Sequence, residues 1–562
     1  MEGVVVELPW QPVGLTDQPW QLHCLGNLTT YKRCLEGLAA LAAGGSTYAA
    51  AVGAASAAPD RVLQHIITAS WQWQQDRGCM SVGEADADAL VQQLKASGEQ
   101  AVGQDVVQCG VSDAQLQAVS GGALNAAQEA AVKAAAEQRL TLIWGPPGTG
   151  KTHTIVQLLR VMLCQQQEGT RSSHPILVCA ETHTATDNIL SKLIASSKAA
   201  GAAAAAAGGE ARHRAAGLRV EKEELLRIGD VGRVTPELRS CTLYALGDKL
   251  TNAAGFLDMK KVRAELASKR VVFATCAAAG ASILQAAGVQ FNTVMVDEAT
   301  QVLEPCCLLP VLLGPAQQLV LVGDHKQLGP CVSAATQGYG LKESLFERLL
   351  ACGAAEPHML TTQYRMHPGI AALPSDCFYG GLLNTHYSNQ SCPTLGPCLQ
   401  PGISLVDVEG RETAAGSSWL NRDEAQAVAR ILRQLLSPNG DGSGSSSSSV
   451  LVARGIGIIT PYKAMVQELR SVMARVPGAG EVEVNTVDAF QGREKDVVIF
   501  CSVRCNSGGR LGFVADARRL NVAVTRARHA LVLVGSRRTL AADELWAQWV
   551  CNTSCRDLRL ES

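Results

Sequence analysis

The sequence has almost no excess of charge of either sign. It contains 49 Lys and Arg residues against 51 Asp and Glu residues, and its formal net charge is −2. This balance argues against a protein that holds nucleic acid through a long basic tail. It does not exclude a basic groove on one face, because binding depends on the local surface and not on the sum.

The paired cysteine spacing of a zinc site is also missing. The 19 cysteines are scattered along the chain, and several lie in apolar runs, where a thiol behaves as a small buried hydrophobe. No C-x-x-C pair comes with a second ligand pair at zinc spacing, and nothing marks the chain as secreted. We therefore expect neither a structural zinc ion nor disulfides.

Segments for secretion or membrane insertion are absent as well. The opening residues, Met-Glu-Gly-Val-Val-Val-Glu, have no basic region followed by an apolar core. No uncharged apolar stretch has the length that spans a bilayer. We expect a soluble intracellular protein, in the nucleus or the cytoplasm, without a membrane partner.

What the sequence does contain is a phosphate-binding loop. It follows an apolar run at 140–144 and precedes a helical pattern that begins near His153, which is the strand, loop and helix order that G-x-x-x-x-G-K-[ST] requires. Glycines let backbone N–H groups approach phosphate oxygens, and the helix N-terminus adds a positive dipole end. The loop consists of Gly145, Pro146, Pro147, Gly148, Thr149, Gly150, Lys151 and Thr152.

This loop predicts a site for ATP and Mg²⁺. Lys151 would reach the β and γ phosphates, and the Thr152 hydroxyl would hold Mg²⁺. A plain Gly-rich turn is the alternative, but it leaves the flanking strand and helix unexplained. We expect the Lys151 side chain to face solvent when no nucleotide is bound.

Apolar runs predict an α/β protein with parallel sheets. Strands buried on both faces and alternating with helical stretches are typical of that class. There are too many runs for one sheet, and they separate near residues 335–357 into a group with the phosphate loop and a group with arginine-rich motifs. The runs lie at 176–179, 270–274, 293–296, 319–322, 456–459, 496–500 and 530–534.

Two acidic residues end the strand predicted at 293–296. Asp297 would hold Mg²⁺ through water, and Glu298 would position and activate the attacking water. A helix cap is the usual role of an Asp-Glu pair after a strand, but the upstream phosphate loop favours catalysis. Asp297 lies far along the chain from Lys151, and an inserted subdomain at about 196–268 would account for the distance.

Further polar groups follow other buried runs. Gln327 comes in a turn directly after a strand, where its amide can sense the γ-phosphate; a purely structural turn is the alternative. Arg365 and Arg526 lie beside apolar segments in the second half of the chain. Arginines delivered from a facing domain stabilise charge on a transferring phosphoryl group, whereas a lone Arg is usually a solvated surface charge.

The ordered motifs resemble those of the superfamily 1B helicases, in the branch that contains the nonsense-mediated-decay and senataxin-type helicases. The resemblance runs from about 124 to 535, with a weaker similarity to the helicase core of GRF-zinc-finger DNA-repair helicases. The matching segments are 145–152, Asp297-Glu-Ala-Thr-Gln, Gly323-Asp-His-Lys-Gln-Leu, Gln363-Tyr-Arg-Met-His-Pro, 487–496 and 519–528.

The resemblance implies two tandem RecA-like lobes that hydrolyse ATP in the cleft between them and bind single-stranded RNA or DNA across their tops. Gln128 would read the adenine and Tyr364 would stack on it. Glu494 would reach the ribose or the phosphates. Arg365 and Arg526 would act as arginine fingers, while Arg528 would support the fold of its motif.

Strand contacts are also implied by the resemblance. Where the family often has Pro-Ser-Asn, this chain has Glu181-Thr182-His183; Thr182 can still bond a phosphate, but Glu181 would repel one. The other positions that match strand-contacting residues are Thr275, Pro461, Tyr462 and Thr486.

The domain organisation follows from the same motifs. We expect a shortened N-terminal barrel and stalk helices at 1–110, a first RecA-like domain at 111–337 and a second at 338–562. A low-complexity loop at 437–449 interrupts the second domain. The protein is expected to be a monomer.

Three functions remain open at this point. The first is an ATP-driven 5′-to-3′ helicase or translocase on RNA or DNA. The second is an ATPase that remodels protein–nucleic-acid complexes without productive unwinding, which an incomplete barrel would favour. The third is an inactive scaffold, which the intact ATP-handling positions disfavour.

Overall fold

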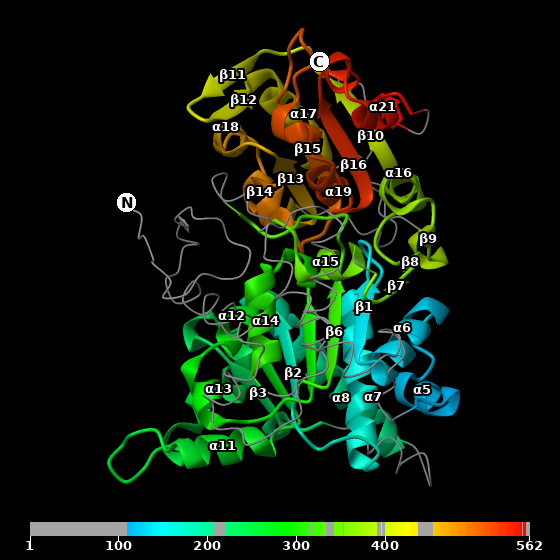
Figure 1. Ribbon diagram of the computed structural model, residues 1–562. Helices are drawn as coiled ribbons and strands as arrows, with labels where there is room; N and C mark the ends of the chain where they lie inside the picture. The colour runs from blue at the N-terminus through cyan, green and yellow to red at the C-terminus, as the bar shows by residue number, and fades with distance from the viewer. Residues whose placement is uncertain are drawn as a thin grey trace, which may run out of the picture. The chain divides into compact units, whose positions relative to one another are not determined.

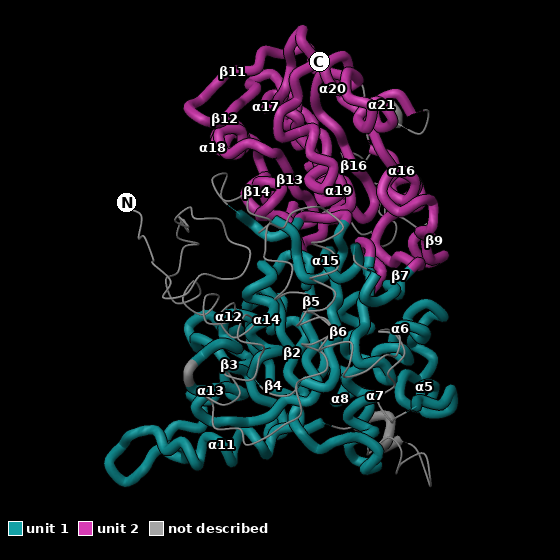
Figure 2. The backbone as a smooth tube through the Cα atoms, viewed as in Figure 1, with its two compact units in different colours: residues 1–145, 151–325, 329–360 teal, residues 146–150, 326–328, 361–562 magenta. Residues whose placement is uncertain are grey.

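The computed structural model describes residues 110–206, 220–313, 316–332, 342–351, 353–390, 395, 399–436, 453–552 and 555–557. The barrel and stalk predicted at 1–110, except for residue 110, and the loop predicted at 437–449 lie outside these ranges. The chain divides into two compact units (Figure 2). Unit 1 comprises residues 1–145, 151–325 and 329–360, and unit 2 comprises 146–150, 326–328 and 361–562.

Unit 1 contains a seven-stranded parallel sheet with strand order β3-β4-β2-β5-β6-β1-β7 (Figure 1). The strands are β1 Leu140–Trp144, β2 Ile176–Ala180, β3 Leu225–Ile228, β4 Val271–Thr275, β5 Thr293–Asp297, β6 Gln318–Gly323 and β7 Pro357–Met359. The helices are α5 Asp113–Ser120, α6 Ala126–Glu137, α7 Lys151–Gln167, α8 His183–Ala206, α10 Leu243–Leu246, α11 Met259–Ser268, α12 Cys276–Ala279, α13 Ser282–Ala287, α14 Glu304–Leu312 and α15 Leu345–Ala351. Short 3₁₀ turns are η1 Lys222–Glu224, η2 Val231–Arg233, η3 Pro236–Cys241, η4 Gly247–Leu250 and η5 Ala299–Gln301.

Both faces of this sheet are covered, because successive side chains on a strand point to opposite faces. In β6, Leu319 and Leu321 join an apolar layer with α11 to α15, whereas Val320 and Val322 join a second layer with α5 to α8. This explains why the strands are apolar throughout instead of alternating.

The stretch predicted as an insertion at about 196–268 contributes to the sheet itself. Leu225–Ile228 forms β3 and pairs in parallel with β4, so it is the edge strand of the sheet. The other described elements of this stretch are short helices and turns together with α11.

One buried arginine ties the amino ends of several strands together. Arg171, in the connection from α7 to β2, is 9% exposed and donates to Thr293 Oγ1 at 3.1 Å and to the side-chain oxygen of Gln318. Gln318 in turn donates to the carbonyl oxygens of Ala135 and Gln138, each at 2.8 Å. The starts of β5 and β6 are thereby joined to the end of α6.

Unit 2 contains a six-stranded parallel sheet with strand order β14-β13-β15-β16-β10-β17 (Figure 1). Its strands are β10 Gly402–Asp407, β13 Ile456–Thr460, β14 Glu483–Thr486, β15 Lys495–Cys501, β16 Ala527–Gly535 and β17 Cys555–Asp557. Two small pairs accompany it, β8 Thr362–Gln363 with β9 Asn384–Thr385, and the hairpin β11 Glu412–Ala415 with β12 Ser418–Asn421. The helices and turns used below are α16 Pro368–Tyr379, α17 Arg422–Leu436, α18 Lys463–Met473, η10 Asp488–Phe490, η11 Gly512–Ala515, α19 Ala517–Val524, α20 Arg537–Leu540 and α21 Glu544–Val550.

The predicted α/β class with parallel sheets is confirmed, and each of the seven predicted runs lies in or overlaps a strand. None of the helices in the described ranges combines the length and the apolar character needed to cross a membrane.

Candidate ATP and nucleic-acid sites

The phosphate loop connects β1 to α7 in a backbone conformation that glycine allows. Gly148 has a φ of 75° and Gly150 a φ of 82°, both in the left-handed region where side chains are disfavoured. The Gly145 N–H donates to the carbonyl of Gly323 at 2.9 Å, which fixes the start of the loop to the end of β6. The Thr149 hydroxyl closes the loop by donating to the carbonyl of Pro146 at 2.7 Å.

Lys151 does not face solvent, in contrast to our expectation. Its side chain is 13% exposed, and Nζ donates to the carbonyl of Gly145 at 2.8 Å. Its ammonium group lies 4.0 Å from Oε1 of Glu298. The reason is local: Lys151 is the first residue of α7, so its side chain can turn back across the loop toward the carbonyl of Gly145, where the loop begins.

The two predicted carboxylates lie at the carboxyl end of β5, between the ends of β2 and β6. Asp297 is 4% exposed and accepts from the Glu298 N–H at 2.9 Å. Burial, followed by the nearby charge of Glu298, raises the pKa of Asp297, and the ammonium of Lys151 opposes this. A buried carboxylate with a raised pKa is a place where a bound cation gains electrostatic energy.

Glu298 occupies a strained backbone position. Its φ is 51°, in the left-handed region that non-glycine residues rarely adopt. Gln301 donates from Nε2 to Oε2 of Glu298 at 2.8 Å and so fixes the direction of the carboxylate. Backbone strain of this kind gathers at functional sites. Gln301 was within the matched motif, but its spacing gave no reason to single it out.

Thr152 and Asp297 carry the kind of oxygen donors that bind Mg²⁺. Thr152 offers a half-buried hydroxyl in the first turn of α7, and Asp297 offers a carboxylate. Hard oxygen donors in small number, completed by water and phosphate oxygens, are what Mg²⁺ prefers. In the described part of the chain, no three His, Cys, Asp or Glu side chains come together as a metal site.

The side chains predicted to contact the nucleotide base make other contacts within the protein. Gln128 is 2% exposed, and its side-chain oxygen accepts from the N–H of Asn125 at 3.1 Å as part of a capping box on α6. His153, two residues after Lys151, contacts the carbonyl of Ala123 through Nε2 at 3.2 Å. Tyr364, in unit 2, is 39% exposed, and the centroid of its ring lies 4.8 Å from that of His386.

Unit 2 brings several of its predicted residues together. Arg365 donates from Nε to Oε2 of Glu494 at 2.7 Å, and Arg528 also bonds this carboxylate. Although burial opposes it, the charges of Arg365 and Arg528 lower the pKa of Glu494 to about 2. Arg526 is 2% exposed and donates to the side-chain oxygen of Gln327 at 3.0 Å.

Asn521 is a residue in this group that the sequence did not single out. It donates to the carbonyl of Lys326 at 2.9 Å and contacts the Tyr379 hydroxyl at 2.7 Å. It therefore holds the turn that carries Gln327. Its place within the segment 519–528 is the only feature of the sequence that pointed to it.

The predicted strand contacts differ in accessibility. Thr182 is exposed, and its hydroxyl accepts from the N–H of Ala185 at 3.2 Å. Thr275 is only 5% exposed and caps α12. Tyr462 is 3% exposed and donates its hydroxyl to the carbonyl of Leu511 at 3.2 Å, so its ring face does not lie open. Pro461 and Thr486 are half-buried, at or just beyond the carboxyl ends of β13 and β14.

Comparison with known proteins agrees with the motifs. Two family models, both described as AAA domains, match residues 123–335 in two overlapping segments and residues 341–538. The chain is 35% identical over 446 residues to the ATP-dependent helicase upf1 of Schizosaccharomyces pombe, which covers 76% of this chain and 46% of that protein. The chain belongs to the superfamily 1 helicases, and the relatives that it matches are nonsense-mediated-decay helicases.

Other relatives in this family give the same result. The Drosophila melanogaster regulator of nonsense transcripts 1 homolog is 36% identical over 449 residues, 75% of this chain and 35% of the relative. The ATP-dependent helicase NAM7 of Saccharomyces cerevisiae is 35% identical over 449 residues, 75% of this chain and 42% of the relative. The chain thus spans less than half the length of these relatives. An arterivirus nonstructural protein 10 helicase matches 73% of the chain with a TM-score of 0.32 and 15% identity, too low to support a conclusion.

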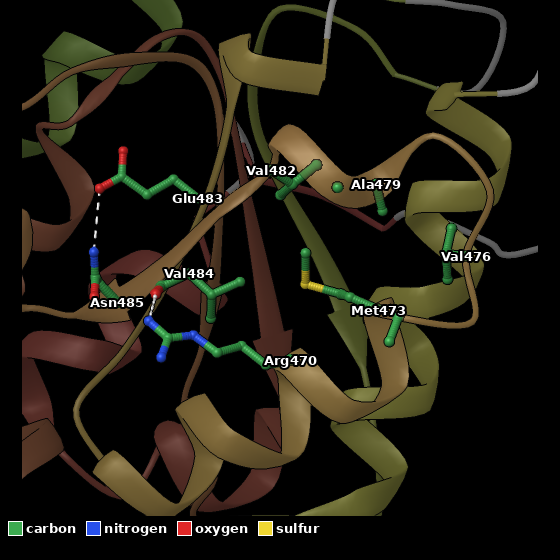
Figure 3. A pocket seen from close by; sticks show the side chains of 10 residues that line it. Arg470, Met473, Val476, Ala479, Val482, Glu483, Val484 and Asn485 are labelled. Carbon is green, nitrogen blue, oxygen red and sulfur yellow. Dashed lines mark hydrogen bonds between the residues drawn. The ribbon is translucent and has the colours of Figure 1, made fainter.

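A separate pocket lies beside the edge strand of unit 2 (Figure 3). It is lined by Arg470, Met473, Ala474, Val476, Ala479, Gly480, Val482, Glu483, Val484 and Asn485. Arg470 donates to the carbonyl of Val484 at 2.9 Å and so satisfies one backbone acceptor of β14. None of the predicted site residues lines this pocket, although Thr486 directly follows it in the chain.

A buried acid, Glu424, contacts the segment that directly follows β15 in unit 2. Glu424, in the first turn of α17, accepts from the N–H of Val503 at 2.9 Å and contacts the Ser502 hydroxyl and the Asn421 amide at 3.3 Å each. Burial raises the pKa of Glu424 to about 8. Burial thus favours the uncharged form of this side chain, and the hydrogen bonds from Val503 and Ser502 oppose it.

Proposed function

We propose that the chain is an ATP-dependent nucleic-acid helicase that moves 5′ to 3′ on single-stranded RNA or DNA. The observation that supports this most strongly is the meeting of Lys151, Asp297 and Glu298 at the carboxyl edge of the unit 1 sheet. In open parallel sheets, ligands bind at that edge. The six ordered motifs and the relatives described as ATP-dependent helicases point to the same activity.

In this proposal, the phosphate loop and the carboxylates at the carboxyl end of β5 have distinct tasks. The loop N–H groups and Lys151 bind the β and γ phosphates, and the ammonium of Lys151 exchanges the Gly145 carbonyl for a phosphate oxygen. Thr152 and Asp297 would hold Mg²⁺, which neutralises phosphate charge when it is bound. Glu298, directed by Gln301, orients the attacking water and receives its proton.

The residues of unit 2 supply positive charge and sensing. Arg365 and Arg526 stabilise charge on the transferring phosphoryl group, and Gln327 responds to the γ-phosphate.

The remaining contacts come from both units. Gln128 and Tyr364 bind the adenine, with His153 and Glu494 as further nucleotide contacts. Thr182 and Thr275 in unit 1 and Pro461 and Thr486 in unit 2 contact the strand, and Tyr462 supports this edge of unit 2 from beneath.

The proposal also covers the domains of the chain, its oligomeric state and its cellular setting. We assign two RecA-like domains in a monomer that works inside the cell, where ATP and exposed nucleic-acid strands are available. Their boundary lies near residue 360 and not at the expected 337/338, because α15 and β7 belong to unit 1. ATP turnover by the purified chain, measured with and without poly(U) and poly(dT), tests the activity and the preferred strand. Turnover that neither polymer stimulates would overturn it.

A strand-displacement assay distinguishes a helicase that unwinds a duplex from an ATPase that only remodels protein–nucleic-acid complexes. A duplex with a 5′ single-stranded tail should be opened in the presence of ATP, whereas a chain that only remodels complexes would show stimulated ATP turnover without displacement. Glu298→Gln serves as the control, because it removes turnover and leaves the binding residues in place.

A further inference from the structure

The aromatic ring of Phe513 in unit 2 is exposed to solvent, and the backbone that carries it is held in place. Phe513, in η11, is 55% exposed, while its neighbours Leu511 and Val514 are 4% and 3% exposed. Single exposed apolar side chains are common on protein surfaces, so Phe513 is notable for how its backbone is held and for where its ring lies.

The backbone on both sides of Phe513 is held by buried aromatic donors. The hydroxyl of Tyr462 donates to the carbonyl of Leu511 at 3.2 Å, and Nε1 of Trp546 donates to the carbonyl of Val514 at 2.8 Å. Gly512 has a φ of 58°, and a Cβ built there would lie 2.9 Å from Nη1 of Arg504. The ring is therefore displayed by a segment that has little freedom to turn it inward.

The ring lies at the edge of the sheet where the strand contacts are proposed. Tyr462 follows β13, and its ring centroid is 6.2 Å from that of Phe513. Strands β13 and β14 are parallel, and Thr460 lies opposite Thr486, so Pro461, Tyr462 and Thr486 lie at the same carboxyl edge of the sheet. The contact with the Tyr462 ring places Phe513 beside this edge. Tyr462 itself is buried, which leaves Phe513 as the aromatic surface at this position.

The charges around the ring favour a base over a phosphate. The guanidinium of Arg519 lies 5.2 Å from the Phe513 centroid and adds a second planar surface. Its charge is already offset by Asp488 at 3.3 Å and Asp516 at 3.2 Å. A phosphate would meet two carboxylates here, whereas a neutral aromatic base meets a ring and a flat cation, which is the combination that single-strand binders use for stacking.

We propose that Phe513 is a stacking platform for one unpaired base of the bound strand, with Tyr462 and Arg519 holding it in place. This inference rests on the proposed function, because it names the part of the strand that this edge contacts. A base on Phe513 contributes affinity that depends little on sequence, because every base has a face that can stack.

The test compares a strand of bases with a backbone that lacks them. Affinity is measured by fluorescence anisotropy for oligothymidylate of about 12 nucleotides, within the range covered by known single-strand folds, and for an abasic chain with the same number of phosphates. Phe513→Ala and Phe513→Leu should each weaken oligothymidylate binding by roughly 5- to 150-fold, the range for one stacked base. Both should leave binding of the abasic chain nearly unchanged, and Phe513→Trp should retain the affinity of the unmodified protein.

Controls make each result decisive. Leu382→Ala removes another side chain of unit 2 that is 55% exposed and should not alter either affinity. ATP turnover without nucleic acid, together with the melting temperature, establishes that each variant is folded; if Phe513→Ala does not fold, Phe513→Leu and Phe513→Trp decide the question.

Three outcomes would reject the platform while leaving the helicase assignment intact. They are unchanged oligothymidylate binding by Phe513→Ala, an equal loss of affinity for oligothymidylate and for the abasic chain, and full oligothymidylate affinity in Phe513→Leu. The last outcome would mean that the ring covers an apolar partner instead. Failure of the unmodified protein to bind either ligand would reject the proposed function and the platform together.

Discussion

Arg365 is tied to Glu494 by a hydrogen bond of 2.7 Å between Nε and Oε2, within unit 2. Because the pKa of Glu494 is lowered to about 2, the pair stays ionised from the unfolded pKa of about 4.3 upward and is lost only as the pH falls through about 2. At neutral pH, Arg365 is thus oriented before any nucleotide binds.

The first prediction concerns turnover by the phosphate-loop site. Lys151→Ala should abolish ATP hydrolysis, because it removes the ammonium that lies 4.0 Å from Oε1 of Glu298 at the phosphate loop. Glu298→Gln should bind ATP but not cleave it, since the amide cannot accept a proton from water. Steady-state turnover and equilibrium binding of a fluorescent ATP analogue measure the two effects. Normal turnover in either folded variant would show that the site is assigned wrongly.

The second prediction concerns the arginines. Arg365→Ala and Arg526→Lys should lower kcat far more than ATP affinity, because arginine fingers are worth about 10³–10⁵ in rate. Arg526 is almost fully buried, so lysine, which keeps the charge, is the safer replacement; a melting curve checks the fold. Arg454→Ala, at an arginine that is 74% exposed, is the matched control. Equal losses in kcat and affinity would mean that these residues hold the ground state.

Glu494 extends this prediction. If its task is to orient Arg365, Glu494→Gln should lower kcat, and the double variant Arg365→Ala, Glu494→Gln should be little worse than Arg365→Ala alone. Residues that share one ion-pair network typically couple by about 0.5–3 kcal/mol. Additive effects on kcat in this cycle would instead assign Glu494 a separate contact with the nucleotide.

The third prediction concerns salt and direction. None of the four residues proposed to contact the strand is a lysine or an arginine, so few charges are neutralised on binding. The affinity should fall less between about 50 and 200 mM salt than the 10³–10⁵ lost by proteins with six to ten ionic phosphate contacts. A 5′-tailed duplex should be unwound and a 3′-tailed duplex should not. Efficient opening from a 3′ tail would reject the polarity.

The fourth prediction concerns the pH dependence of stability. The pKa of Glu424 is raised to about 8 in the folded chain, so the stabilisation from its bound proton is fully present below the unfolded pKa of about 4.3 and is lost as the pH rises to about 8. Glu424→Gln cannot ionise and should flatten this dependence. Each pH unit between the two pKa values is worth about 1.4 kcal/mol, or about 3–6 °C in melting temperature for a domain of this size.

Melting curves between about pH 5 and pH 8 provide the measurement, and the variant should melt above the unmodified protein at the upper end. Asp423→Asn is the control, because it changes the adjacent, exposed acid of the same helix turn. A fall in melting temperature of equal steepness in Glu424→Gln and in the unmodified protein would contradict the burial argument.

Much of the ATP site was predictable from local sequence. The loop 145–152 and the pair Asp297-Glu298 each follow an apolar run directly, so strand, turn and chemistry are adjacent in the chain. The two parallel sheets follow from the same runs, because strands buried on both faces are apolar at every position. Gln301 escaped prediction, since its role depends on the left-handed turn at Glu298 and not on its residue type.

Other features depend on distant contacts that no short pattern contains. Glu483–Thr486 is polar and short, and it becomes β14 only because β13 offers a free edge. Leu225–Ile228 joins the sheet within a stretch that was predicted as an insertion. The side chain of Lys151 turned inward where we expected it to face solvent. Burial of Tyr462 and the raised pKa of Glu424 follow from tertiary packing, which sequence periodicity does not reveal.

The contacts of Arg171 with Thr293 and Gln318 have a consequence for how unit 1 folds during synthesis. Arg171 reaches Thr293 and Gln318, 122 and 147 positions later in the chain, and β7, which completes the sheet, ends only at Met359. A nascent chain that has emerged through β2 holds a guanidinium whose acceptors are still to be synthesised. The first ATP-binding unit therefore cannot close during translation until nearly two thirds of the polypeptide has left the ribosome, and fragments cut before β6 should remain open to proteases.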